Sequence, residues 1–142
     1  MGEQLSCSRR APPAVAAKDD KAVDLDSRKT SRLAVSVGRD QTLRLWDLDS
    51  CSCLKHWNGH HSWVTCVAVD WQSMRVLSGG GDHNLVLWNL RTAEQIRIFR
   101  AHADFITCLA VNWGSGSFIS GSRDNTIKLW HTDRRTCEKT LH

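Results

Sequence analysis

The chain has 142 residues, of which 41% are hydrophobic and 24% are charged, and its formal net charge is +4. This length suits one globular domain, and this composition excludes a disordered or fibrous protein. The sequence contains no run of 18 or more apolar residues, and residues 1–10 lack the apolar core of a secretory signal. We therefore expect an intracellular protein, in the cytoplasm or the nucleus, with no membrane span.

Residues 1–20 are predicted to form a disordered basic leader. They contain Pro12, Pro13 and an Ala-rich stretch, a composition typical of segments that bury little surface. Basic residues continue beyond the leader, and the N-terminal part of the chain includes Arg9, Arg10, Arg28, Lys29 and Arg32. Such charges can attract nucleic acid or acidic partners. No aromatic residues are interleaved with them for base stacking, so a solvated leader is the favoured interpretation.

The rest of the sequence predicts short β-strands. The first candidate strand, Ala22 to Ser27, is weak because two aspartates alternate with its apolar residues, so it is either degenerate or unformed. Stronger β-type runs follow over residues 64–69, 95–99, 106–111 and 137–141. No stretch sustains the 3.6-residue period of a helix, so the sequence indicates an all-β chain.

Three segments repeat at an interval of 42 residues, namely residues 35–46, 77–88 and 119–130. Each is predicted to form a strand, a tight turn and a second strand, because Gly, Asp and Asn in the turn tolerate positive φ and the strand after it alternates apolar with polar residues. The residues that recur in register are Ser36, Ser78 and Ser120; Asp40, Asp82 and Asp124; and Trp46, Trp88 and Trp130. A period near 42 with four short strands is typical of a propeller blade.

Two dipeptides accompany this repeat. One is Trp46-Asp47, which becomes Trp88-Asn89 and Trp130-His131; the other is Gly59-His60, which becomes Ala101-His102. On these motifs the chain resembles the WD-repeat β-propeller family over residues 22–142. The resemblance implies three consecutive four-stranded antiparallel blades, over about residues 21–58, 59–100 and 101–142, in a partial or open propeller.

The resemblance also implies a hydrogen-bonded set of side chains inside each blade. The implied sets are His60, Ser78, Asp82 and Trp88; His102, Ser120, Asp124 and Trp130; and, in the first blade, Ser36, Asp40 and Trp46. An indole N–H can only donate, so a buried Trp needs an acceptor such as a Ser hydroxyl. The set of the first blade has no histidine, because Lys18 stands one period before His60.

Ser, His and Asp also form hydrolase triads, but an enzyme is not favoured. The trio recurs with the repeat, whereas a catalytic site is normally built once. Residues 114–117, Gly-Ser-Gly-Ser, match neither the spacing nor the context of a nucleophile elbow. Neither the cysteines nor the group His56, His60 and His61 has the ligand spacing of a zinc site. We expect no catalytic residues, no metal, no cofactor and no small-molecule substrate.

In the family the loops between blades and the turns that carry the Asp lie on one rim and commonly contact partners. The residues that this resemblance places on the rim are Arg39, Arg123, Trp63, Phe105, Thr65 and Thr107. Aromatic and Arg side chains are favoured in interface hot spots. The alternative, that Trp63 and Phe105 merely cover blade edges, stays open.

The leading hypothesis for function is a scaffold or adaptor that binds proteins or peptides through this rim within a multiprotein complex. The alternative is an RNA- or chromatin-associated regulatory module that uses Arg39, Arg123 and the basic leader. Propellers usually have four to eight blades, and an arc of three leaves an apolar face at each end. We therefore expect either a fragment of a longer propeller or a chain that completes the ring by self-association.

Overall fold

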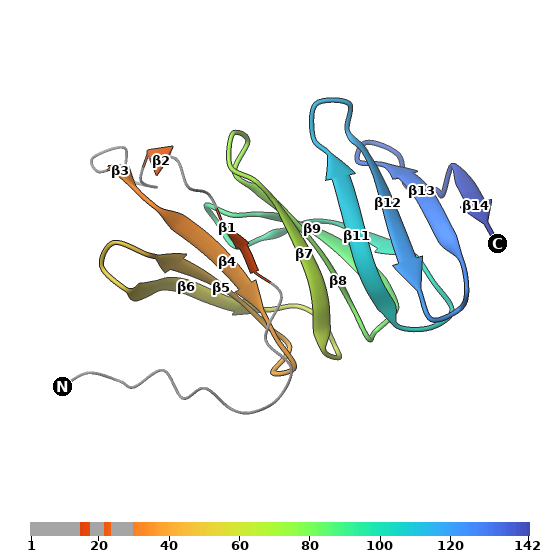
Figure 1. The fold of residues 1–142 in the computed structure, drawn as a ribbon, viewed down its shortest axis with the longest axis horizontal. Helices are drawn as coiled ribbons and strands as arrows, with labels where there is room; N and C mark the ends of the chain where they lie inside the picture. The colour runs from red at the N-terminus through yellow and green to blue at the C-terminus, as the bar shows by residue number, and fades with distance from the viewer. Residues whose placement is uncertain (1–14, 18–21, 24–29) are drawn as a thin grey trace.

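The computed structural model describes residues 15–17, 22–23 and 30–142, and these residues form strands and turns without a helix. Within them, three four-stranded antiparallel sheets follow one another along the chain (Figure 1). Blade 1 consists of β1 (Val15–Ala17), β4 (Leu33–Val37), β5 (Thr42–Asp47) and β6 (Ser52–Asn58). Blade 2 consists of β7 (Val64–Asp70), β8 (Arg75–Gly80), β9 (Asn84–Asn89) and β10 (Gln95–Arg100). Blade 3 consists of β11 (Ile106–Asn112), β12 (Ser117–Ser122), β13 (Ile127–His131) and β14 (Lys139–Leu141).

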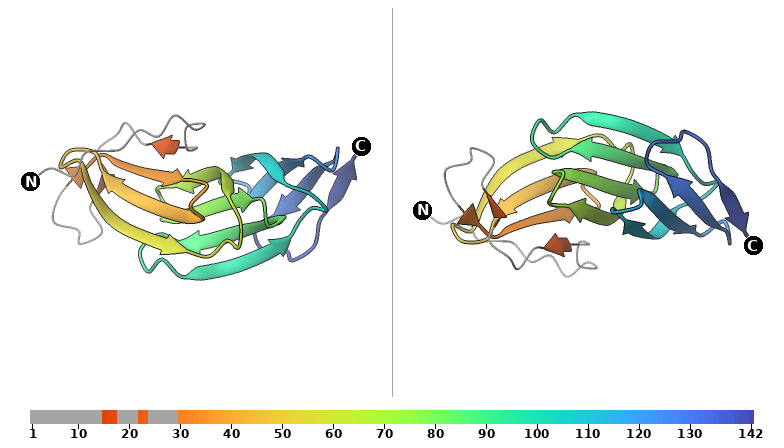
Figure 2. Two further views of the ribbon diagram at one scale, coloured as in Figure 1. Left: turned by 90° about the horizontal axis from the view of Figure 1, so that it is seen from below. Right: turned by 90° about the horizontal axis from the view of Figure 1, so that it is seen from above.

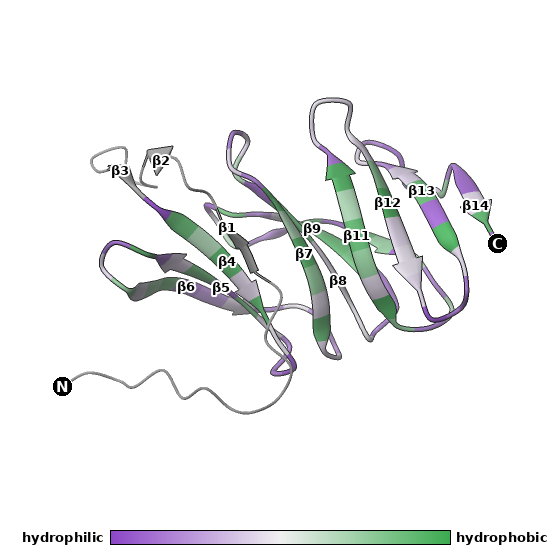
Figure 3. Cartoon of the chain, in the orientation of Figure 1, coloured by the Kyte–Doolittle hydropathy of each residue, from purple (hydrophilic) through white to green (hydrophobic). Residues whose placement is uncertain are grey.

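The sheets form an open arc, which confirms the all-β fold of partial propeller blades. Blade 2 lies between the other two, with β7 between β4 and β11 (Figure 1). In both views of Figure 2 the outer strands β6 and β10 lie along the same edge of the molecule. Hydrophobic residues cover much of β4, β7 and β11, and hydrophilic residues are frequent in the connecting loops (Figure 3).

The inner strand of blade 1 differs from the one that the sequence predicts. β1 takes this place and pairs with β4, with Val15 opposite Ser36. The matching pair in blade 2 is Val67 opposite Ser78. The expected strand, Ala22 to Ser27, is therefore wrong. β7, the inner strand of blade 2, has no fully exposed residue, and aspartates in such a place would lose hydration without a partner.

Two short strands account for the described part of that segment. β2 (Ala22–Val23) pairs with β3 (Thr30–Ser31) in a separate two-stranded sheet, and residues 24–29 lie outside the described residues. The predicted leader, residues 1–20, overlaps β1, and the rest of it also lies outside the described residues.

Each blade has two faces, named here by the direction of the chain. The leading face is turned toward the preceding blade and the trailing face toward the following one. In β8, Val76 belongs to the core cluster shared with blade 1, and Leu77 belongs to the cluster shared with blade 3. In β9, Trp88 belongs to the cluster shared with blade 1, and Leu87 belongs to the cluster shared with blade 3. The period-2 alternation of the strands therefore supplies both inter-blade cores.

The turns repeat with the same 42-residue period in their backbone angles. The residue after the turn Asp has positive φ in every blade, with values of 67° at Gln41, 68° at His83 and 63° at Asn125. Each turn Asp also accepts a hydrogen bond from the N–H two residues later, which fixes the turn locally. This geometry explains how the same hairpin forms from three different sequences.

The dipeptide that varies from Trp-Asp to Trp-Asn and Trp-His serves one local purpose. Its second residue accepts a backbone N–H two residues on: the Asp47 carboxylate at 2.9 Å, the Asn89 side-chain oxygen at 2.9 Å and the His131 ring nitrogen Nδ1 at 3.2 Å. Any short side chain with an acceptor in that place stabilises the turn. The Asp of this motif is therefore replaceable, whereas the preceding Trp is the same residue in all three blades.

Polar contacts also join neighbouring blades. The Lys55 ammonium in β6 donates to the Arg91 carbonyl of blade 2, and the Arg97 guanidinium in β10 donates to the Thr132 carbonyl of blade 3. Lys55 and Arg97 are one period apart. The Thr65 hydroxyl of β7 donates to the backbone carbonyl at Ile106, the first residue of β11.

The loop before β7 has a steric requirement that tests this packing. A Cβ atom on Gly59 would lie 1.9 Å from Cη2 of Trp88, far inside van der Waals contact. We predict that Gly59→Ala lowers the free energy of unfolding by about 1–3 kcal/mol or more, because the Trp88 ring is enclosed by the core and cannot move aside. Urea unfolding followed by Trp fluorescence measures the change. Gly114→Ala is the control, since its Cβ would meet nothing closer than 3.4 Å; equal losses would contradict the steric account.

Candidate functional site

The recurring polar residues of blade 2 form one continuous hydrogen-bonded network. The Trp88 indole Nε1 lies 2.8 Å from Ser78 Oγ, and Ser78 Oγ lies 2.8 Å from His60 Nε2. His60 Nδ1 lies 3.0 Å from the Asp82 carboxylate. The indole can only donate and the ionised carboxylate can only accept, so the protons run from Trp88 to Ser78, from Ser78 to His60 and from His60 to Asp82. Every buried polar group of this network has a partner.

Blade 3 contains the same network and blade 1 contains half of it. In blade 3, Trp130 Nε1 lies 3.0 Å from Ser120 Oγ, and Ser120 Oγ lies 2.8 Å from His102 Nε2. His102 Nδ1 lies 2.8 Å from the Asp124 carboxylate. In blade 1 the Trp46 indole donates to Ser36 at 2.8 Å.

The turn Asp of blade 1 does not join the Ser36–Trp46 pair. Asp40 accepts instead from the Thr42 hydroxyl at 2.8 Å and from the Arg44 guanidinium at 3.0 Å. Lys18 occupies the sequence position of the missing histidine, so no imidazole is available from that position to connect the carboxylate to the serine.

The electrostatics of the turn aspartates follow from these contacts. Burial by itself would raise the pKa of Asp82, but hydrogen bonds from His60, the His61 N–H and the Asn84 N–H outweigh it and lower the pKa. Burial likewise opposes the shift at Asp124. There the Thr126 hydroxyl, the Ala103 N–H and His102 hold the pKa far below its usual range. Both carboxylates therefore stay ionised in the folded protein at neutral pH.

The geometry places these Ser, His and Asp residues inside the blades rather than at a reactive surface. Ser78 and Ser120 are fully buried, and each hydroxyl accepts an indole N–H. Burial also raises the pKa of the Cys66 thiol to about 11, which removes its nucleophilic form at neutral pH. Among the described residues no three His, Cys, Asp or Glu side chains are grouped so that they could hold a metal ion.

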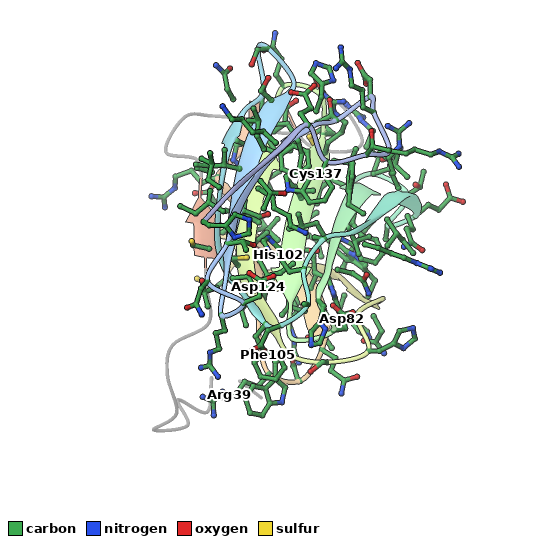
Figure 4. All side chains as sticks on the ribbon, turned by 90° about the vertical axis from the view of Figure 1, so that its right-hand side faces the viewer. Arg39, Asp82, His102, Phe105, Asp124 and Cys137 are labelled. Carbon is green, nitrogen blue, oxygen red and sulfur yellow. The ribbon has the colours of Figure 1, made fainter. Side chains whose placement is uncertain are left out.

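Arginine and aromatic side chains form a continuous stack along the rim that carries the turn aspartates. The Arg39 guanidinium lies 4.6 Å from the centroid of the Trp63 ring, and the centroids of Trp63 and Phe105 are 6.3 Å apart. The Arg123 guanidinium lies 5.4 Å from the Phe105 centroid. We call these four residues the rim stack; it begins in blade 1 and ends in blade 3. Figure 4 shows Phe105 and Arg39 close together at one end of the molecule.

The middle blade leaves room for the stack. Gly81 stands where blades 1 and 3 have Arg39 and Arg123, and a Cβ there would lie 3.3 Å from the Phe105 ring and 2.8 Å from Ser62 Oγ. His83, in the same turn, packs against Phe105 with a centroid distance of 6.0 Å. Sequence reasoning did not single out His83; its position directly after a turn Asp was the available signal.

The two threonines predicted on the rim have separate surroundings. The Thr65 hydroxyl donates to carbonyls of Gly79 and Ile106 and so lies in the contact between blades 2 and 3. The Thr107 hydroxyl donates to the Gly121 carbonyl at 3.2 Å, and its side chain is exposed. The structure thus brings Arg39, Trp63, Phe105 and Arg123 together but places the threonines on the trailing side of their blades.

Comparison with protein families agrees with this architecture. The family model described as WD domain, G-beta repeat matches the chain three times, at residues 17–47, 51–89 and 93–131. The first match begins at Ala17, the last residue of β1. Each match ends at the residue that follows the recurring Trp. The described residues contain no helix long and apolar enough to cross a membrane.

The network makes a prediction about stability. Ser78→Ala leaves the Trp88 indole and His60 without a partner in the core, so we expect a loss of about 1–3 kcal/mol in the free energy of unfolding. The matched variant Ser36→Ala affects a half-buried pair with no histidine and should cost less than about 1 kcal/mol. Chemical unfolding of both variants decides the matter, and a Ser36→Ala loss as large as that of Ser78→Ala would count against the network.

The lowered pKa values of Asp82 and Asp124 predict acid sensitivity. A carboxyl group with a lower pKa in the folded than in the unfolded state stabilises the fold above its unfolded pKa, about 3.9. That contribution is lost as the pH falls through and below about 4. We expect the free energy of unfolding to decrease steeply from pH 4.5 to pH 3, and less steeply in Asp124→Asn. The exposed Asp133→Asn is the control, and it should keep the wild-type slope.

Proposed function

Because the chain belongs to the WD domain, G-beta repeat family, we propose that it is a scaffold that binds protein or peptide partners through the rim stack. Proteins of this family are in general protein-interaction scaffolds and are generally not catalytic. The observation that supports binding at particular residues is the rim stack, which consists of Arg39, Trp63, Phe105 and Arg123.

The rim stack has the composition of a binding hot spot. Trp63 is 44% exposed although it is a large hydrophobic residue, and both arginines are exposed. Aromatic and Arg side chains contribute most to binding when a partner encloses them. The stacking also holds each long side chain in place before the partner arrives, which lowers the entropic cost of binding.

The guanidinium groups keep donors for a partner. Among the described residues neither Arg39 nor Arg123 forms an ion pair, whereas Arg44 is paired with Asp40. A guanidinium that lies on an aromatic ring still presents N–H groups at its edges, and these suit carbonyl or carboxylate acceptors of a peptide. The stack can therefore supply apolar contact and hydrogen bonds at one place.

A protein partner fits this rim better than a nucleic acid does. The same loops carry carboxylates, since Asp40 flanks Arg39 and Asp104 precedes Phe105. A polyanion would be repelled by these groups, whereas a protein surface of mixed charge can match them. The RNA- or chromatin-associated alternative predicts affinity that falls steeply as salt rises.

Affinity capture with the 142-residue chain, followed by identification of the captured protein and titration of the purified pair, tests the proposal. We expect Trp63→Ala, Phe105→Ala and Arg123→Ala each to weaken binding by about 2 kcal/mol, or about thirtyfold in Kd. Arg91→Ala, an exposed arginine in the β9–β10 turn, is the control and should bind as the wild type does.

Circular dichroism must show that the rim variants are folded. Folded rim variants that bind with wild-type affinity would overturn the rim assignment. A captured partner that is a nucleic acid, with a Kd that rises by orders of magnitude between 50 and 200 mM salt, would favour the alternative function instead.

A further inference from the structure

The carboxylates along the rim are already held by groups of the chain itself. Asp40 accepts the Arg44 guanidinium at 3.0 Å. The side chains of Asp82 and Asp124 are only 8% and 11% exposed, and both face the histidines of their networks. Asp104 accepts a backbone N–H at 2.6 Å. The negative groups of these loops are therefore used within the molecule.

The two arginines of the rim stack have no such partners among the described residues. The guanidinium groups of Arg39 and Arg123 lie on aromatic rings, and both side chains are exposed. A guanidinium pairs best with a carboxylate, which accepts two of its N–H groups side by side. Each end of the rim stack is therefore suited to an acidic side chain of a partner.

The centre of the rim stack is aromatic. The rings of Trp63 and Phe105 lie between the two arginines at an angle of 54° to each other. Position 81, where the repeat would place a third arginine, is a glycine and adds no charge. Along the rim, the stack thus presents a positive charge, two aromatic rings and a second positive charge.

The length of the rim stack limits the peptide that can reach both arginines. Its three contacts, at 4.6, 6.3 and 5.4 Å, keep the two guanidinium groups within about 16 Å of each other, which is about the reach of five extended residues. Side chains at positions i, i+2 and i+4 of an extended peptide point to the same side, and the outer two are about 13 Å apart. A five-residue segment can therefore place one side chain at each end of the stack and one at its centre.

We propose that the rim stack binds an extended peptide segment in which two acidic residues, four positions apart, flank an apolar residue. One carboxylate pairs with Arg39 and the other with Arg123, and the apolar side chain between them lies against Trp63 and Phe105. This inference rests on the proposed function, because it names the chemistry of the partner at the same site.

Selection of peptides from a random twelve-residue phage library on the immobilised 142-residue chain tests the proposal. Peptides that bind the wild type but not Trp63→Ala should be enriched in Asp or Glu at two positions four residues apart, with an apolar residue between them. Replacing either acidic residue of a selected synthetic peptide by Ala should raise its Kd about tenfold, because a charged hydrogen-bonded pair is lost.

Reversing one charge at a time assigns each acidic residue to its arginine. Arg39→Glu should prefer a peptide with Lys at one of the two acidic positions, and Arg123→Glu should prefer Lys at the other, because each opposite pair is restored. Arg91→Glu, in the β9–β10 turn, is the matched control and should keep the wild-type preference. Circular dichroism establishes that the three variants fold.

The outcomes separate this inference from the proposed function. Peptides that require Trp63 but show no acidic enrichment, or whose preference does not change in either rim variant, would contradict the acidic motif and leave rim binding intact. A library whose binders all tolerate Trp63→Ala, or that yields no binder, would count against rim binding itself and therefore against both proposals.

Discussion

The structure depends on the need of one buried indole N–H for an acceptor. Trp88 is 2% exposed, and its N–H is satisfied by Ser78, which leaves the serine proton for His60. His60 then donates to Asp82, whose carboxylate also accepts the His61 and Asn84 N–H groups. One requirement for a hydrogen bond therefore connects β9, β8, the loop before β7 and the β8–β9 turn. An unsatisfied member would cost about 1–3 kcal/mol, which is a large share of the stability of a small domain.

This dependence explains how far the sequence predicts the fold. The Ser, Asp and Trp of the network recur at fixed positions in all three blades, so the period of 42 by itself indicates strands, turns and blades. The prediction is wrong for blade 1, where the network lacks its histidine. There the inner strand is Val15–Ala17 rather than Ala22 to Ser27, and Asp40 pairs with Arg44. Where the buried hydrogen bonds are missing, the period no longer determines which segment completes the sheet.

The rim shows a different limit of sequence reasoning. Arg39, Trp63, Phe105 and Arg123 could be placed on one edge by analogy between repeats, but their stacking could not, because it crosses blade boundaries. Arg39 of blade 1 lies on Trp63 of blade 2, whereas Arg123 lies on Phe105 of its own blade. Thr65 shows the same limit: the sequence predicts a partner contact there, and the structure shows its hydroxyl donating to a carbonyl of the next blade. Contacts between repeats depend on the twist from one sheet to the next, which a periodic pattern does not contain.

Positions that keep the period and positions that break it have different roles. Ser78 and Trp88 are the same residues in every blade, and they maintain the architecture. Position 81 breaks the period: an arginine there would repeat Arg39 and Arg123, but its Cβ would already press on Ser62 and Phe105. Gly81 lets Phe105 lie beside Trp63, so the two aromatic rings touch and the two arginines lie at the ends of the stack. A perfectly regular repeat would separate the rings with a third guanidinium, and the rim stack therefore arises from the irregularity of the sequence rather than from its period.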